Sequence, residues 1–110
     1  MRLPNANQVI VDIRKLKDYC LEPLHPRGKH KARVFERALN LTQRNAEELR
    51  EEILRRVPYE EALLGEGDDY GKRYVVDFEY IRGGRRARIR TCWILRTGET
   101  APRLTSCFVL

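Results

Sequence analysis

Groups that can bind anions or transfer protons are concentrated in the eleven residues HPRGKHKARVF, from His25 to Phe35. His25 and His30 carry side chains that titrate near neutral pH. Lys29 and Lys31 stand at the expected start of a helix, where backbone N–H groups attract an anion. Cations at that end oppose the helix dipole, and such a conflict is tolerable if an anion such as phosphate completes the site. The segment therefore predicts a phosphate-binding site with an acid or a base beside it.

A second pair of candidates, Arg103 and Thr105, lies near the end of the chain in PRLTSCFVL. The two residues alternate along an expected strand, so both side chains point to the same face of the sheet. In the expected register Arg103 lies opposite Ile94 and has no acidic partner. This favours an anion-binding role for Arg103, with Thr105 as a neighbouring hydrogen-bonding group.

Arg88 and Arg90 are expected on that same sheet face, where they are candidates to contact a nucleic-acid backbone. Glu79 and Asp77 are expected directly opposite them, so a solvated cross-strand charge ladder explains these arginines equally well. Both explanations remain open from the sequence.

The opening segment also has structural explanations. The ring of His25 can pack on Pro26 or form a hydrogen bond with a neighbouring turn, and His30 can be a solvated surface residue. Lys31 lies four residues before Phe35 and can be a boundary lysine whose aliphatic stem packs at the rim of the core.

The leading hypothesis is a metal-independent endoribonuclease of toxin type, in which the ribose 2′-hydroxyl attacks the adjacent phosphate. This chemistry needs a base, an acid and cations on the phosphorane. We expect His25 as acid or base, Lys31 and Arg103 as phosphate stabilisers, and Thr105 as an orienting group. RNA contacts are expected from Arg88, Arg90, Lys29 and His30. The alternative is a non-catalytic basic module that binds nucleic acid or an acidic partner, such as a small antitoxin or immunity protein.

Composition is consistent with either function. The 110 residues predict one domain, 1–110, and the net charge of +6 favours anionic partners such as RNA. Three cysteines without a CxxC pair support neither a zinc site nor a disulfide framework, so no metal or other cofactor is expected. No leader or apolar run of membrane-spanning length is present, which favours a soluble cytoplasmic protein without a membrane partner.

The elements that must position these residues follow from two hydrophobic periods. Helical spacing predicts helices over residues 12–21, 29–40 and 43–57, with Asp12 and Thr42 as N-caps and Asn40 as a left-handed stop. Alternation with period two predicts strands over 73–81, 85–95 and 102–110, and QVIV at 8–11 is a candidate fourth strand. The connection over 58–71 is expected mainly as loop. The fold class is α+β, with N-terminal helices packed on one face of a C-terminal antiparallel β-meander of three to four strands.

The register follows from a tight turn at Gly83-Gly84 and a second turn around Gly98. The first hairpin should pair Tyr74 with Trp93, Asp77 with Arg90, Phe78 with Ile89, Glu79 with Arg88 and Arg82 with Arg85. The second should pair Trp93 with Leu104, Cys92 with Thr105, Thr91 with Ser106, Arg90 with Cys107 and Ile89 with Phe108. The expected core comprises Tyr74, Phe78, Ile89, Trp93, Leu104 and Phe108 with Phe35, Leu39, Leu49 and Ile53.

Three segments, KLKDYCLEPLHPRGKHKARVFERALNLT, GKRYVVDF and TCWILRTGETAPRLTSCFVL, resemble a family of small uncharacterised bacterial domains of unknown function. The family pattern includes HPxGxxKAxxF and PRLxxCxV, and the resemblance covers nearly the whole chain. Cys20 stands where the pattern has an apolar residue, and Phe108 replaces a tyrosine. A looser similarity, in element order and charge, links the chain to the barnase, EndoU, colicin and RelE-like ribonuclease toxins. Those toxins cleave RNA without metal, using assorted His, Lys, Arg, Thr and Tyr residues.

Overall fold

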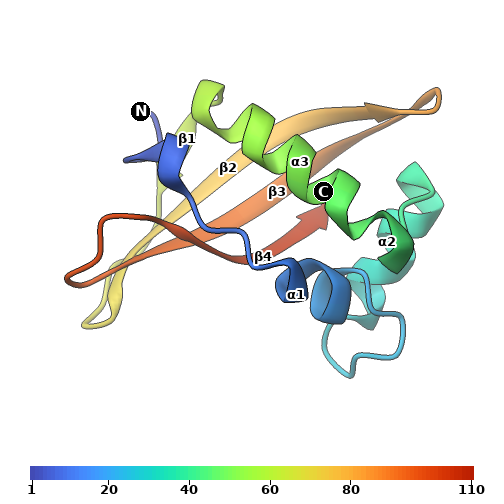
Figure 1. The fold of residues 1–110 in the computed structure, drawn as a ribbon, viewed down its shortest axis with the longest axis horizontal. Helices are drawn as coiled ribbons and strands as arrows, with labels where there is room; N and C mark the ends of the chain where they lie inside the picture. The colour runs from blue at the N-terminus through green and yellow to red at the C-terminus, as the bar shows by residue number, and fades with distance from the viewer.

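The computed structural model describes all 110 residues as helices followed by an antiparallel sheet, the predicted α+β class (Figure 1). The helices are α1 (Ile13–Lys15), which continues into a π turn η2 (Leu16–Cys20), α2 (Lys29–Leu39) and α3 (Ala46–Arg56). Short 3₁₀ turns are η1 (Ala6–Gln8), η3 (Gln43–Asn45) and η4 (Val57–Tyr59). The strands are β1 (Ala62–Leu64), β2 (Gly71–Arg82), β3 (Arg85–Arg96) and β4 (Arg103–Val109).

The predicted helix boundaries are confirmed by their caps. The Asp12 carboxylate accepts the backbone N–H of Arg14 at 3.0 Å, which starts α1. α2 ends at Asn40, whose φ of 56° is left-handed, and the Thr42 backbone N–H donates to the side chain of Asn45 in a reciprocal cap before α3.

The sheet is an antiparallel meander of order β1-β2-β3-β4. Gly83 and Gly84, with φ of 54° and 79°, form the two-residue turn between β2 and β3. The register of this hairpin is as predicted: Tyr74 with Trp93, Asp77 with Arg90, Phe78 with Ile89, Glu79 with Arg88 and Arg82 with Arg85.

The register between β3 and β4 is as predicted only at its start, for Trp93 with Leu104 and Ile94 with Arg103. Trp93 lies opposite Leu104, but an irregularity between Cys92 and Trp93 moves every later pair by one residue. Thr91 therefore faces Cys107 and Ile89 faces Val109, whereas Cys92 faces Ser106 and Arg90 faces Phe108. Cys107 is consequently fully buried, and Phe108, expected in the core, is only half-buried. A run of small residues, Thr-Ser-Cys, satisfies either register, so alternation alone could not detect the extra residue.

The fourth strand also differs from the prediction. It is β1, within the connection expected as loop, and pairs with β2 through Leu63 opposite Val75. The candidate segment 8–11 contributes only a parallel bridge from Ile10 to Arg103.

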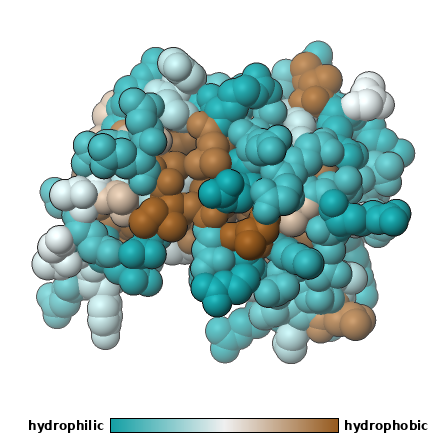
Figure 2. Space-filling model, in the orientation of Figure 1, coloured by the Kyte–Doolittle hydropathy of each residue, from teal (hydrophilic) through white to brown (hydrophobic).

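The helices lie on one face of the sheet, with α3 in front of the strands in Figure 1. The predicted apolar residues of α2 and α3 meet Trp93 and Phe78 in one buried cluster. The Trp93 indole donates to Thr91 Oγ1 at 2.8 Å, and that hydroxyl donates to the Val76 carbonyl at 2.6 Å, so these two buried polar side chains are paired. Figure 2 shows that hydrophilic side chains cover most of the helix-bearing face around a few apolar patches. None of the helices is both long and apolar enough to cross a membrane.

Candidate functional site

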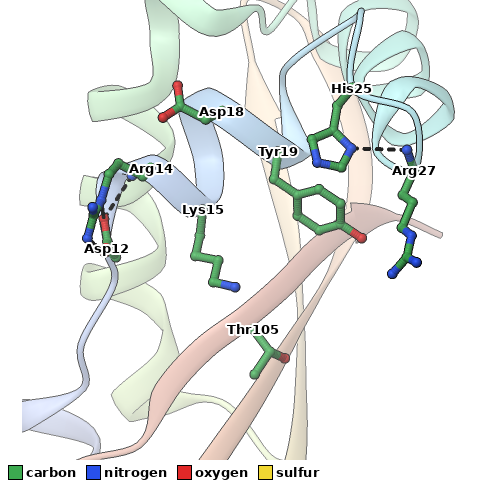
Figure 3. Close-up of a pocket in the computed structure, with 8 residues that line it drawn as sticks. All are labelled: Asp12, Arg14, Lys15, Asp18, Tyr19, His25, Arg27 and Thr105. Carbon is green, nitrogen blue, oxygen red and sulfur yellow. Dashed lines mark hydrogen bonds and ion pairs between the residues drawn. The ribbon is translucent and has the colours of Figure 1, made fainter.

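A polar hollow of about 610 Å³ lies where the N-terminal helical segment and the following loop meet β4 (Figure 3). It is open to solvent and only one of its lining residues is hydrophobic. The lining residues are Asp12, Arg14, Lys15, Asp18, Tyr19, His25, Arg27 and Thr105.

The π turn η2 places Tyr19 in this hollow. The N–H of Leu21 donates to the carbonyl of Leu16 at 2.8 Å, and the widened turn buries Leu16 and Cys20 while leaving Tyr19 half-buried at the surface. A Cβ atom on Gly28 would lie 2.3 Å from the Tyr19 carbonyl oxygen and 3.0 Å from its ring. Only glycine lets the loop approach Tyr19 this closely.

A contact between two buried cysteines, Cys20 and Cys107, joins η2 to β4. The backbone N–H of Cys107 donates to Cys20 Sγ at 3.4 Å, and neither side chain is exposed. The hydrogen bond between the thiols lowers the pKa of Cys20 and, together with burial, raises that of Cys107. This contact sets the position of Tyr19, one residue before Cys20, relative to Thr105 on β4.

His25 closes the loop. Its Nδ1 accepts the backbone N–H groups of Arg27 and Gly28, each at 3.0 Å, which is one of the structural roles foreseen for this residue. A nitrogen that accepts two hydrogen bonds carries no proton, so the neutral ring keeps its proton on Nε2. The ring also packs edge-on against Tyr19 with 4.8 Å between centroids. His25 is therefore arranged to donate a hydrogen bond through Nε2–H rather than to accept a proton there.

Lys31 reaches Tyr19 from α2. Its Nζ donates to the Tyr19 hydroxyl at 3.2 Å and lies 5.2 Å from the ring centroid. An ammonium group there stabilises negative charge that develops on the tyrosine oxygen.

The charges around the hollow are only partly paired. Asp12 and Arg14 form an ion pair at 2.7 Å, and the hydrogen bond from the Arg14 side chain lowers the pKa of Asp12 to about 2. Lys15 and Arg27 make no ion pair anywhere in the structure. In Figure 3 the Lys15 side chain extends into the space near Thr105, while the Asp18 carboxylate points away from Tyr19. Two free cations thus face the hollow.

The four residues expected to be catalytic come together only in part. His25 and Thr105 line the polar hollow, and Lys31 borders it through Tyr19. Arg103 lines a neighbouring hollow, of which Asp12, Lys15 and Thr105 also form part. Thr105 Oγ1 donates to the Cys92 carbonyl at 3.1 Å, which leaves its oxygen free to accept a hydrogen bond.

The expectation that Arg103 has no acidic partner is wrong. Its guanidinium binds the Glu99 carboxylate through two contacts of 2.9 and 3.2 Å, and this pairing raises the pKa of Arg103. The register placed only Ile94 opposite Arg103, correctly, but the turn between β3 and β4 folds Glu99 back onto it.

The expected RNA contacts are dispersed. Arg90 binds Asp77 through two contacts of 2.9 Å, so the charge-ladder explanation holds for this pair. Arg88 has no ion pair, because Glu79 lies within reach of Arg86 instead, and it lines a separate hollow beside β1. Lys29 begins α2, and His30 is exposed on the following position.

No group of three or more His, Cys, Asp or Glu side chains is placed to hold a metal ion.

Residues 2–110 match a protein family described as a domain of unknown function, DUF6883. The chain belongs to that family. No curated protein and no solved structure matches the chain significantly. Within this DUF6883 domain, the HPxG sequence has a physical explanation: His25 accepts the two loop N–H groups, and Gly28 permits the close approach to Tyr19.

Sequence reasoning missed Tyr19, Lys15 and Arg27 as members of the DUF6883 hollow. Tyr19 lies in the segment 12–21, where regular helical spacing is expected, and the π turn departs from that spacing at this residue. Arg27 lies inside the HPRGKHKARVF segment, so the excess of cations there was a usable signal. Nothing in the sequence indicates that Lys15 lines the hollow, because only the packing of η2 against β4 brings it there.

Proposed function

We propose that this domain is a metal-independent endoribonuclease that acts at the polar hollow. The observation that carries the proposal is the convergence of His25, Tyr19 and Thr105 with two unpaired cations, Lys15 and Arg27. A phosphate diester has the complementary charge, and the hollow is large enough for one phosphate with its ribose.

The groups present suit attack by the ribose 2′-hydroxyl on the adjacent phosphate. The bond from O2′ to phosphorus forms while the bond from phosphorus to O5′ breaks. Lys15 and Arg27 bind the phosphate oxygens, and His25 Nε2–H donates to the oxygen on which charge develops. Tyr19 delivers its proton to the leaving O5′, while Lys31 stabilises the tyrosinate that forms.

The remaining proton steps involve Thr105 and water. The free acceptor on Thr105 Oγ1 orients the 2′-hydroxyl, which loses its proton to solvent as it attacks. Tyr19 regains a proton from solvent after the products leave. The products are a 2′,3′-cyclic phosphate and a 5′-hydroxyl end.

A second function, anion binding without chemistry, is favoured by one observation. The hydrogen bonds at Nδ1 already give His25 a structural role in the loop. In that case the hollow binds the RNA backbone, or an acidic partner protein, through the same cations.

The decisive experiment incubates EDTA-treated protein with single-stranded RNA and with DNA of the same sequence. We expect cleavage of the RNA to cyclic phosphate ends and no cleavage of the DNA, which lacks the nucleophile. Tyr19→Phe should retain RNA binding and lose roughly 10²- to 10⁴-fold in rate, the usual contribution of a general acid. Binding without cleavage by the unaltered protein would refute the enzyme and leave the binding function.

Lys15→Met and Lys72→Met form a matched pair for the cation argument. Both remove one exposed, unpaired lysine charge, but Lys72 lies on β2 and outside the hollow. Lys15→Met should weaken RNA binding about tenfold or more, as loss of a direct phosphate contact does, and Lys72→Met should have a much smaller effect. Equal losses would show that net charge, and not the hollow, attracts RNA.

A further inference from the structure

Another hollow, here called the apolar hollow, lies beside the contact between Lys31 and Tyr19. It has a volume of about 360 Å³ and lies between the first turns of α2 and the end of β4. Val34, Phe108 and Val109 supply apolar walls, and His30 and Lys31 supply the polar groups. This lining contrasts with that of the polar hollow, where charged and hydroxyl groups predominate.

Lys31 connects the two hollows, because it lines the apolar hollow and its Nζ donates to the hydroxyl of Tyr19, which lines the polar hollow. Its Nζ lies 5.2 Å from the Tyr19 ring centroid on one side and 5.7 Å from the Phe108 ring centroid on the other. The register shift in β4 is what turns Phe108 out of the core and into this position. The polar hollow and the aromatic-lined apolar hollow are therefore related through Lys31, which contacts Tyr19 of one and Phe108 of the other.

We propose that the apolar hollow is a nucleobase subsite for RNA held at the polar hollow, and the assignment rests on the proposed function. A nucleotide has the same division, with a charged phosphate-ribose part and a flat, weakly hydrated base. Phe108 and the two valines offer the apolar contact that sequence-tolerant base binding uses. The apolar walls provide no hydrogen bond to a phosphate, so the base is expected in the apolar hollow and the phosphate in the polar hollow.

The polar groups at the hollow narrow the class of base. A lysine ammonium group only donates hydrogen bonds, and one donation from Lys31 is already directed to Tyr19. The remaining donors suit a base edge that presents acceptors, and guanine presents two, O6 and N7, on one edge. We therefore expect guanine to be favoured over adenine, which places an amino donor at the corresponding position.

The test compares guanosine 5′-monophosphate, adenosine 5′-monophosphate and ribose 5-phosphate by calorimetry or NMR titration. Guanosine monophosphate should bind at least about tenfold more tightly than ribose 5-phosphate, which corresponds to about 1.4 kcal/mol. Phe108→Ala should abolish that difference without changing the affinity for ribose 5-phosphate. Equal affinities for the three ligands, or no binding of any, would overturn the subsite.

Because Phe108 is half-buried, a second variant protects the test against unfolding. Val34 is 37% exposed, so Val34→Gln keeps the fold and places a polar side chain in the hollow. Its control is Ile81→Gln, at an exposed position on β2 outside both hollows. Val34→Gln should reduce the guanine preference, and Ile81→Gln should not. Equal behaviour of the two variants would show that the hollow does not contact the base.

The same data separate the two proposals. Cleavage of RNA with no preference among the three ligands would refute the subsite and leave the ribonuclease. A guanine preference that depends on Phe108, without any RNA cleavage, would refute the ribonuclease and leave a nucleotide-binding site. Binding of an apolar peptide at this hollow in place of nucleotide would overturn the subsite.

Discussion

Replacing His25 with alanine and with asparagine separates its structural role from a chemical one. Alanine removes the acceptor that the N–H groups of Arg27 and Gly28 share, both at 3.0 Å. Asparagine keeps an oxygen at the position of Nδ1, where it can accept the same two hydrogen bonds, but it lacks the Nε2–H group. Only the alanine variant loses the hydrogen bonds within the loop, whereas both variants remove the Nε2–H donor from the hollow.

The cost of the alanine variant can be worked from these contacts. The Arg27 N–H is in an exposed residue and can bind water, so its loss costs little. The Gly28 N–H is in a buried residue, and leaving it unsatisfied costs about 1–3 kcal/mol. Loss of the edge-on contact with Tyr19 adds about 0.5–1.5 kcal/mol. We expect about 1.5–4.5 kcal/mol in total, which lowers the melting temperature by roughly 6–20 °C in a domain of this size.

The assay pairs thermal unfolding with RNA cleavage. His25→Ala should show the lower melting temperature and little cleavage. His25→Asn keeps the loop hydrogen bonds and loses the edge-on contact with Tyr19, so its melting temperature should fall by less than that of the alanine variant. Its rate should still fall roughly 10²-fold or more, because a donor to the developing charge is missing. An asparagine variant that is both stable and fully active would assign His25 to the loop alone. An alanine variant with an unchanged melting temperature would refute the hydrogen-bond argument itself.

Three further substitutions test the loop, the hydrophobic core and an ion pair that support the site. Gly28→Ala should lower both the melting temperature and RNA affinity, because its Cβ would overlap the Tyr19 carbonyl oxygen; an unchanged melt would contradict the close approach. Trp93→Ala should destabilise by about 3–5 kcal/mol in denaturant unfolding, and a loss below about 1 kcal/mol would remove Trp93 from the core. The hydrogen bond from Arg82 holds the pKa of Glu48 below its usual 4.5, so this pair stabilises the fold above that pH and less as pH falls through the lowered pKa. Glu48→Gln should therefore differ from the original protein most at neutral pH and least in acid below the lowered pKa, and a constant difference in unfolding free energy would refute this.

The first hairpin was predictable because its sequence permits one register only. Tyr74, Phe78 and Trp93 are large and apolar, and a slip of one residue would place arginines beneath the helices. The Gly83-Gly84 turn independently fixes the same pairing. The helices were predictable for a similar reason, since the apolar stripe of α2 stops where Asn40 adopts a left-handed conformation and that of α3 begins after the cap formed by Thr42 and Asn45.

The second hairpin and the site were harder to predict from the sequence. Both depend on local irregularities that hydrophobic periodicity does not reveal. The extra residue in β4 falls among Thr105, Ser106 and Cys107, which are small enough for either face. The π turn that exposes Tyr19 breaks the 3.6-residue period within a single turn. The partner of Arg103, Glu99, comes from a turn, where strand register says nothing about side-chain contacts. Alternation and helical spacing locate the elements and miss these local departures, which are the features that shape the hollows.

The distribution of carboxylates explains why the loop, and not the open sheet face, carries the candidate site. On the sheet, Asp77 and Glu99 neutralise Arg90 and Arg103, so these guanidinium groups have little left to offer a phosphate. Nine of the sixteen carboxylates lie between residues 47 and 69, on α3 and the connection that follows it. Residues 24–33 contain four cations and no carboxylate. In the proposed complex with RNA, this charge distribution would favour approach of the anionic chain to the loop beside the hollows and disfavour approach to the acidic segment, before any specific contact is made.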